Sequence, residues 1–160
     1  MSTETTEEAV TAAAVESGQP TIVIPVWFWV VAAVALVWNL MGVYMFIEQM
    51  NMSEAAYGAM EPEVAELYKQ VPMWANIAFG VAVIAGTLGS GLLLARSKFA
   101  TAVLVISVIG VAAQQAYFYF MSDIMTVMGP SGMVMPAVVM IVAIGLIAFS
   151  TSSREKLWLR

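Results

Sequence analysis

The chain has 160 residues, of which 61% are hydrophobic and 11% are charged, and its formal net charge is −5. Soluble domains carry about 25% charged residues, so this composition predicts a membrane protein. The absence of cysteine and histidine excludes disulfides and Cys- or His-based zinc sites, and the negative charge argues against a nucleic-acid partner.

Residues 1–19 are polar and acidic, which is typical of a disordered cytoplasmic tail and unlike a secretory signal peptide. Four apolar stretches follow, each near the roughly 20 residues that cross the hydrocarbon of a bilayer. Free of Asp, Glu, Lys, Arg and His, they cover residues 26–47, 73–95, 99–121 and 133–150. We therefore expect an all-α fold in which residues 20–160 form one polytopic domain, an antiparallel bundle of four transmembrane helices.

Basic residues gather on one side of this topology. With four spans, both chain ends and the turn at residues 95–99 face the same side of the membrane. That side carries five of the six basic residues: Arg96, Lys98, Arg154, Lys156 and Arg160. Only Lys69 lies on the other side, so the positive-inside rule predicts that both termini are cytoplasmic.

The loop at residues 48–72 is expected to form a cap on the outer side. Ser53 followed by Glu54 indicates a helix N-terminus, and Pro62 fits the first turn of a second short helix. The loop also contains five glutamates: Glu48, Glu54, Glu61, Glu63 and Glu66. Their negative potential could attract cations, although an exposed run of charge is usually a solvated face.

Small residues recur along three of the expected spans, and in lipid they allow close contact between helices. In the second span they follow one another at four-residue steps: Ala78, Ala82, Gly86 and Ser90. The first span has a similar face of Ala32, Ala35, Asn39 and Gly42, and the third has one of Ser107, Gly110 and Gln114. Together with the acidic cap, these faces predict an accessory or interaction subunit that docks onto a larger membrane complex or a second copy.

The amide side chains within the spans fall in the outer half of the bundle. The amides are those of Asn39, Asn76, Gln114 and Gln115, and Tyr44 and Tyr117 lie at the same level. We expect these six residues to line a polar pocket that opens outward and binds a small neutral solute. The alternative is that the amides form hydrogen bonds between helices, each contributing on the order of 0.6 kcal/mol.

The stretch MSDIMTVMGPSGMVMP at residues 121–136 contains five methionines. Thioethers are soft ligands that select Cu(I), so Met121, Met125 and Met128 are a candidate copper site. Methionine also fills irregular apolar gaps. We favour this second interpretation, in which the stretch is a flexible loop, turned by its glycines and proline, that packs methionines over the outer mouth of the bundle.

Three segments carry a resemblance to a known family: VWNLMGVYMFIEQMNMS, YKQVPMWANIAFGVAVIAGTLGSGLLL and GPSGMVMP. They resemble a family of small, largely uncharacterised bacterial four-helix inner-membrane proteins, some of whose members carry a sugar-transporter label. The resemblance covers about residues 26–150. It implies a four-helix fold in the bacterial inner membrane and implies no particular mechanism.

Catalysis is the least expected activity, because the chain has no His, no Cys and no carboxylate within a span to act as acid, base or nucleophile. No cofactor is expected. Besides the accessory role there are two alternatives: a sugar-like solute transporter that acts as an oligomer, and methionine-based handling of Cu(I). The expected partners are the lipid bilayer and either a second copy of the chain or a larger membrane complex.

Overall fold

Four long helices dominate a computed structural model that describes residues 22–160. They are α2 (Val26–Met50), α5 (Met73–Leu94), α6 (Ala100–Phe120) and α8 (Val134–Glu155). Four segments, the last of which includes α8, are long and apolar enough to cross a membrane. The predicted all-α bundle of four spans is therefore confirmed, and the predicted tail at residues 1–19 lies outside the described residues.

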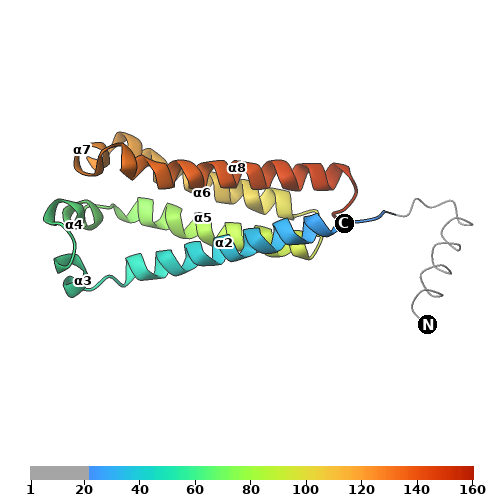
Figure 1. Cartoon of the computed structure of the whole chain (residues 1–160), viewed down its shortest axis with the longest axis horizontal. Coiled ribbons are helices and arrows are strands. Elements are labelled where there is room, and N and C mark those ends of the chain that lie inside the picture. Colours follow the sequence, from blue (N-terminus) through green and yellow to red (C-terminus); the bar gives the residue numbers. More distant parts are fainter. Residues whose placement is uncertain (1–21) are drawn as a thin grey trace, which may run out of the picture.

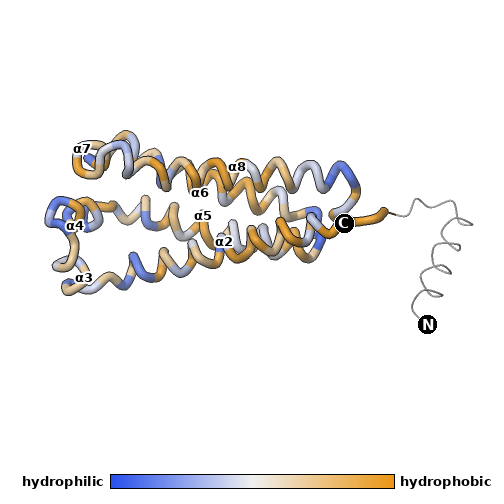
Figure 2. Tube along the Cα trace, in the orientation of Figure 1, coloured by the Kyte–Doolittle hydropathy of each residue, from blue (hydrophilic) through white to orange (hydrophobic). Residues whose placement is uncertain are grey.

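Consecutive spanning helices run antiparallel, so residue 22 and the C-terminus lie at one end of the bundle (Figure 1). We call this the terminal end, and we call the opposite end the loop end. Hydrophilic residues concentrate at the two ends and hydrophobic residues between them (Figure 2). The terminal end carries the five basic residues named above, and every methionine of the described residues lies in the half of the bundle nearest the loop end.

The loop end is built from short helices. Between α2 and α5 lie α3 (Glu54–Gly58) and α4 (Pro62–Lys69). The two predicted helix starts are confirmed, because Ser53 Oγ accepts a hydrogen bond of 3.2 Å from the Ala56 amide and Pro62 is the first residue of α4.

The expected loop between the third and fourth spans is instead mostly helical. It contains α7 (Ile124–Met128) and the 3-10 helix η1 (Gly129–Met133). Gly129 has φ of 63°, a left-handed conformation that glycine adopts without steric cost. This single residue ends α7 and lets the chain continue at once into η1, so no extended loop is formed.

At the α5–α6 interface the backbones of the two helices come close to each other. A Cβ added to Gly110 would lie 2.8 Å from the Ala82 nitrogen and 2.9 Å from the Ala78 oxygen. Beside it, Ser107 Oγ donates a 2.6 Å hydrogen bond to the Ala82 oxygen. Glycine is therefore required at residue 110, because any side chain would meet backbone atoms of α5 and not a movable side chain.

The same ridge of α5 also receives α2. A Cβ on Gly42 would lie 3.0 Å from Val83 Cγ1, and Asn39 Nδ2 donates to Ser90 Oγ at 3.1 Å. The small-residue faces were expected to dock onto a partner. The α5 ridge makes contacts within the chain, because α5 packs between α2 and α6, and docking of a small-residue face onto a partner stays a prediction.

The remaining pair of neighbours, α2 and α8, does not pack along its length. These two helices meet at the terminal end through aromatic rings. Phe28 lies 5.5 Å from Phe149 and 5.7 Å from Trp158 between ring centroids, and Trp27 lies 5.4 Å from Trp158. Phe28 is fully buried, so this aromatic cluster closes the terminal end.

Two matching helix ends hold Trp158 in that cluster. α8 ends with the Trp158 amide donating to the Ser153 oxygen at 2.9 Å and the Leu157 amide to the Arg154 oxygen at 3.0 Å. These bonds, with Leu157 at φ of 57°, make a Schellman motif, in which the left-handed residue is most often glycine. α5 ends in the same way, with Arg96 at φ of 58° in the left-handed position.

The two helix ends are tied together by a short clasp, which we define as residues 96–98 paired with residues 157–160. The Lys98 amide donates to the Arg160 oxygen at 2.7 Å, and the Arg160 amide donates to the Arg96 oxygen at 2.6 Å. Arg96 Nε also donates to the Trp158 oxygen at 2.8 Å. Burial, and then the positive charge of Arg160, lower the pKa of Arg96 from its ordinary value, although a guanidinium stays charged.

Candidate functional site

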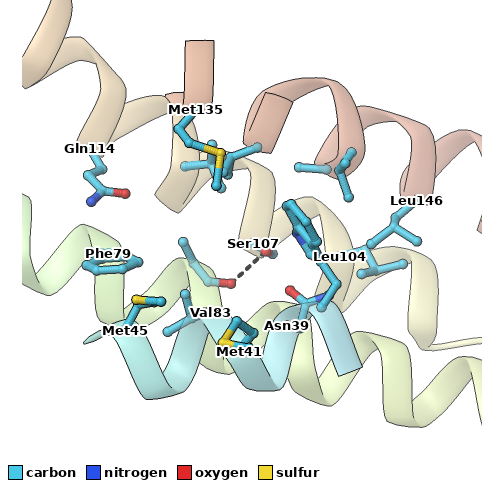
Figure 3. A pocket seen from close by; sticks show the side chains of 17 residues that line it. Asn39, Met41, Met45, Phe79, Val83, Leu104, Ser107, Gln114, Met135 and Leu146 are labelled. Carbon is cyan, nitrogen blue, oxygen red and sulfur yellow. Dashed lines mark hydrogen bonds between the residues drawn. The ribbon is translucent and has the colours of Figure 1, made fainter. Parts of the chain in front are cut away.

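A cavity of about 260 Å³ lies inside the bundle and is lined by all four spanning helices (Figure 3). α2 and α5 contribute Trp38, Asn39, Met41, Gly42, Met45, Phe79, Ala82 and Val83. α6 and α8 contribute Leu104, Ser107, Val111, Gln114, Met135, Val139, Val142, Ala143 and Leu146. None of these side chains is titratable, and most are apolar.

The position of the cavity follows from the way α2 and α8 diverge. Leu104 and Leu146 line the cavity and also belong to the hydrophobic core around Phe28 and Trp158. The core therefore closes the cavity toward the terminal end. Toward the loop end α2 and α8 separate (Figure 1), and the residues at this part of the cavity include Met45, Gln114 and Met135 (Figure 3). The cavity thus lies where these two helices fail to pack.

Asn39 is the polar residue at the middle of the cavity. Its Nδ2 donates to the Ala35 oxygen at 2.9 Å and to Ser90 Oγ at 3.1 Å. The Ala35 carbonyl can only accept, so the side-chain atom of Asn39 that faces it is the nitrogen. Asn39 Oδ1 packs against Gly86 of α5, where an added Cβ would overlap it.

Two further polar side chains share the cavity. Ser107 Oγ already donates its hydrogen to the Ala82 oxygen and lies 3.0 Å from the place of a Gly86 Cβ. Gln114 lies nearer the loop end (Figure 3) and forms no side-chain hydrogen bond among the described residues. Every fully buried polar side-chain atom in residues 22–160 has a partner, so the amide of Gln114 and Asn39 Oδ1 border on open space.

Of the six predicted binding residues, Asn39 and Gln114 come together at the cavity, and the other four lie elsewhere. Asn76 Oδ1 accepts from Gln49 Nε2 at 2.9 Å. Gln115 Nε2 donates to the Pro136 oxygen at 2.6 Å, and Tyr117 Oη donates to the Gln70 oxygen at 3.1 Å. Tyr44 is 54% exposed on the outside of the bundle. Four of the six, including Asn39 through its bond to Ser90, thus form hydrogen bonds between elements, as in the hydrogen-bonding alternative.

Ser107 is a cavity residue that the sequence placed only on a packing face. Its spacing of seven residues from Gln114 puts both on one side of α6, and this spacing was the available signal. The methionines of the cavity, Met41, Met45 and Met135, carry no such signal, because other methionines, such as Met73 and Met121, are exposed away from it.

The candidate copper ligands lie apart from this cavity. Met121, Met125 and Met128 are 65%, 51% and 40% exposed, and none of them lines it. Within residues 22–160 there is no group of three or more His, Cys, Asp or Glu side chains that could hold a metal. A thioether site for Cu(I) at these residues stays a prediction.

Comparisons with protein-family models, with curated proteins and with solved structures find no match to this chain. The resemblance to small bacterial inner-membrane proteins therefore also stays a prediction. Functional inference depends on the cavity and its chemistry.

Proposed function

We propose that this multi-pass membrane protein binds the hydrocarbon chain of a membrane-dissolved molecule in the cavity between α2 and α8, and that it does so without catalysis. One observation carries the proposal: a mostly apolar cavity is lined by all four helices at the place where two of them do not pack. A molecule dissolved in the bilayer could enter between α2 and α8 without passing through water.

The size of the cavity favours part of a molecule over a whole one. Pockets that enclose drug-sized ligands occupy about 300–1,000 Å³, and this cavity has about 260 Å³. A single hydrocarbon chain would fit such a space, and the rest of the molecule would remain in the bilayer.

The lining favours a lipid over the sugar-like solute considered as an alternative. A sugar presents hydroxyl groups on all sides, and each one loses water on entering an apolar site. Only four lining side chains, those of Trp38, Asn39, Ser107 and Gln114, can form hydrogen bonds along this cavity. The lining also lacks a titratable side chain for proton transfer, which supports a binding role.

The proposal includes an orientation. Arg96, Lys98, Arg154, Lys156 and Arg160 all lie at the terminal end, and the positive-inside rule favours the cytoplasm for that end. The open part of the cavity, toward the loop end, would then face the outer leaflet of the membrane.

A photoactivatable alkyl probe tests the binding role in lipid nanodiscs. We expect the native chain to be labelled on cavity residues of α2 and α8, as identified by peptide mass spectrometry. Ala143→Phe should reduce this labelling about tenfold, because Ala143 lines the cavity and a phenyl ring would fill it.

The matched control is Gly145→Phe, which adds the same ring two residues away, where nothing lies within 4 Å of the added Cβ. This variant should leave cavity labelling unchanged. Labelling of the cavity that is no stronger than labelling of exposed α8 residues such as Ile141 and Ile144 would refute the proposal.

A further inference from the structure

We infer that the ligand of this cavity is an uncharged lipid bearing a hydroxyl group, and that the hydroxyl donates a hydrogen bond to Asn39 Oδ1. The inference rests on the proposed function, since it names the chemical class of the molecule that the cavity binds. It depends on which hydrogen-bonding capacities the protein has already used.

The ligand must be uncharged where it enters the cavity. None of the lining side chains carries a charge, and within the bundle an unpaired ion is costly because neither lipid nor apolar side chains solvate it. A phosphate or ammonium headgroup would find no counter-ion at Asn39, Ser107 or Gln114. A neutral polar group is the only kind that these three side chains can satisfy.

The donors of Asn39 and Ser107 are fully used. An asparagine amide has two N–H donors, and those of Asn39 go to the Ala35 oxygen and to Ser90 Oγ. A serine hydroxyl has one donor, and that of Ser107 goes to the Ala82 oxygen. A ligand group that can only accept, such as a ketone, an ether or an ester, finds no free donor on Asn39 or Ser107.

Two hydrogen-bond acceptors remain free at the level of Asn39 and Ser107. Asn39 Oδ1 accepts no hydrogen bond from the described residues, and Ser107 Oγ keeps its lone pairs. Both oxygens lie beside Gly86, since a Cβ on that residue would overlap Asn39 Oδ1 and lie 3.0 Å from Ser107 Oγ. One hydroxyl group placed here would give Asn39 Oδ1 the donor it lacks.

Glycine at residue 86 makes this arrangement possible. Without a side chain, α5 allows the Asn39 carbonyl from α2 and the Ser107 hydroxyl from α6 to approach the same point from two sides. The apolar walls formed by residues such as Val83, Val139 and Met135 would then hold the hydrocarbon chain of the ligand. The polar group of the ligand is thus anchored inside the bundle and not at the membrane surface.

Competition between two matched ligands tests the inference in the native chain. A long-chain primary alcohol and its methyl ether share the chain and the oxygen, and only the alcohol donates. We expect the alcohol to displace the photoactivatable alkyl probe from nanodisc-embedded protein at about fivefold lower concentration than the ether, as one hydrogen bond of ordinary net strength implies.

Two leucine variants locate the effect. Asn39→Leu should remove the difference between alcohol and ether, while continued displacement by the ether shows that the cavity is still formed. Asn76→Leu should keep the difference, because that amide accepts from Gln49 and does not line the cavity. If Asn39→Leu does not fold, Asn39→Ala takes its place and should also remove the difference, because it too lacks Oδ1.

Equal displacement by alcohol and ether in the native chain overturns the hydroxyl inference but leaves the proposed function intact, because both ligands still bind. A preference for the alcohol that survives Asn39→Leu also overturns it. Failure of both ligands to displace the probe, together with no specific labelling of the cavity, refutes the proposed function itself.

Discussion

The two interfaces on either side of this bundle differ in how their helices meet. At the α5–α6 interface, Gly110 places the α6 backbone against Ala78 and Ala82 of α5, and a serine hydroxyl bonds directly to an α5 carbonyl. At the α2–α8 side the helices meet through large rings at the terminal end and then diverge around a cavity.

The difference shows what keeps neighbouring helices in contact within a lipid bilayer. Helices gain no hydrophobic advantage from packing on each other when lipid tails are equally apolar, so contact requires close backbone approach or hydrogen bonds. Small residues supply both at α5–α6. At α2–α8 the contact comes from aromatic rings at the terminal end, so this is the side that a membrane-dissolved ligand could open.

Removing Trp158 should have the largest effect, because its ring belongs to the aromatic cluster through which α2 and α8 meet. Trp158→Ala deletes a 9% exposed ring that contacts Trp27 and Phe28, and it should lower the free energy of unfolding by about 3 kcal/mol. Reversible unfolding in mixed micelles, followed by circular dichroism, measures this loss.

The same variant should separate the two helices. The chain contains no cysteine, so spin labels can be attached directly to introduced cysteines at Val30 and Ala148, both of which are exposed. Trp158→Ala should broaden the distance between them, whereas a label pair at Leu88 and Val105 across α5–α6 should be unaffected. Equal broadening of both pairs would contradict the comparison of the two interfaces.

Gly110→Ala should have the next largest effect. Its methyl group would lie under 3.0 Å from backbone atoms of Ala78 and Ala82, and overpacking of this kind typically costs about 1–3 kcal/mol. The free energy of unfolding in mixed micelles checks the loss. Gly145→Ala is the control, since nothing lies within 4 Å of its added Cβ and alanine is the better helix former by about 0.8 kcal/mol. A similar loss in both variants would mean that α6 is not in backbone contact with α5.

Leu157→Gly should have the smallest effect, and it should stabilise. Leu157 has φ of 57° and is 61% exposed, so glycine would remove left-handed strain of about 1 kcal/mol while losing little contact. Arg96→Gly relieves the same strain but deletes the hydrogen bond from Arg96 Nε to the Trp158 oxygen, and it should give no net gain. Thermal unfolding of the two variants side by side checks the sign, and a stabilised Arg96→Gly would show that the clasp contributes nothing.

The spans and helix starts could be predicted from the sequence because each depends on neighbours along the chain. A run of apolar residues fixes a span, and Ser53 and Pro62 fix the helix starts, without reference to distant residues. The six-residue pocket was harder to predict, because pocket residues must be brought together from different helices. Asn39 and Gln114 line the same cavity, whereas Asn76 accepts a hydrogen bond from Gln49.

The sequence by itself determined the number, length and antiparallel order of the membrane-spanning helices, since hydropathy and turn residues are local properties. It also identified the small residues of α5 as contact residues, because only such residues permit close approach in lipid. Only the tertiary structure decided that those contacts are made within the chain, and that α2 and α8 diverge beyond Trp158. Helix rotation and splay depend on how all four faces fit at once, and no stretch of sequence specifies that fit alone.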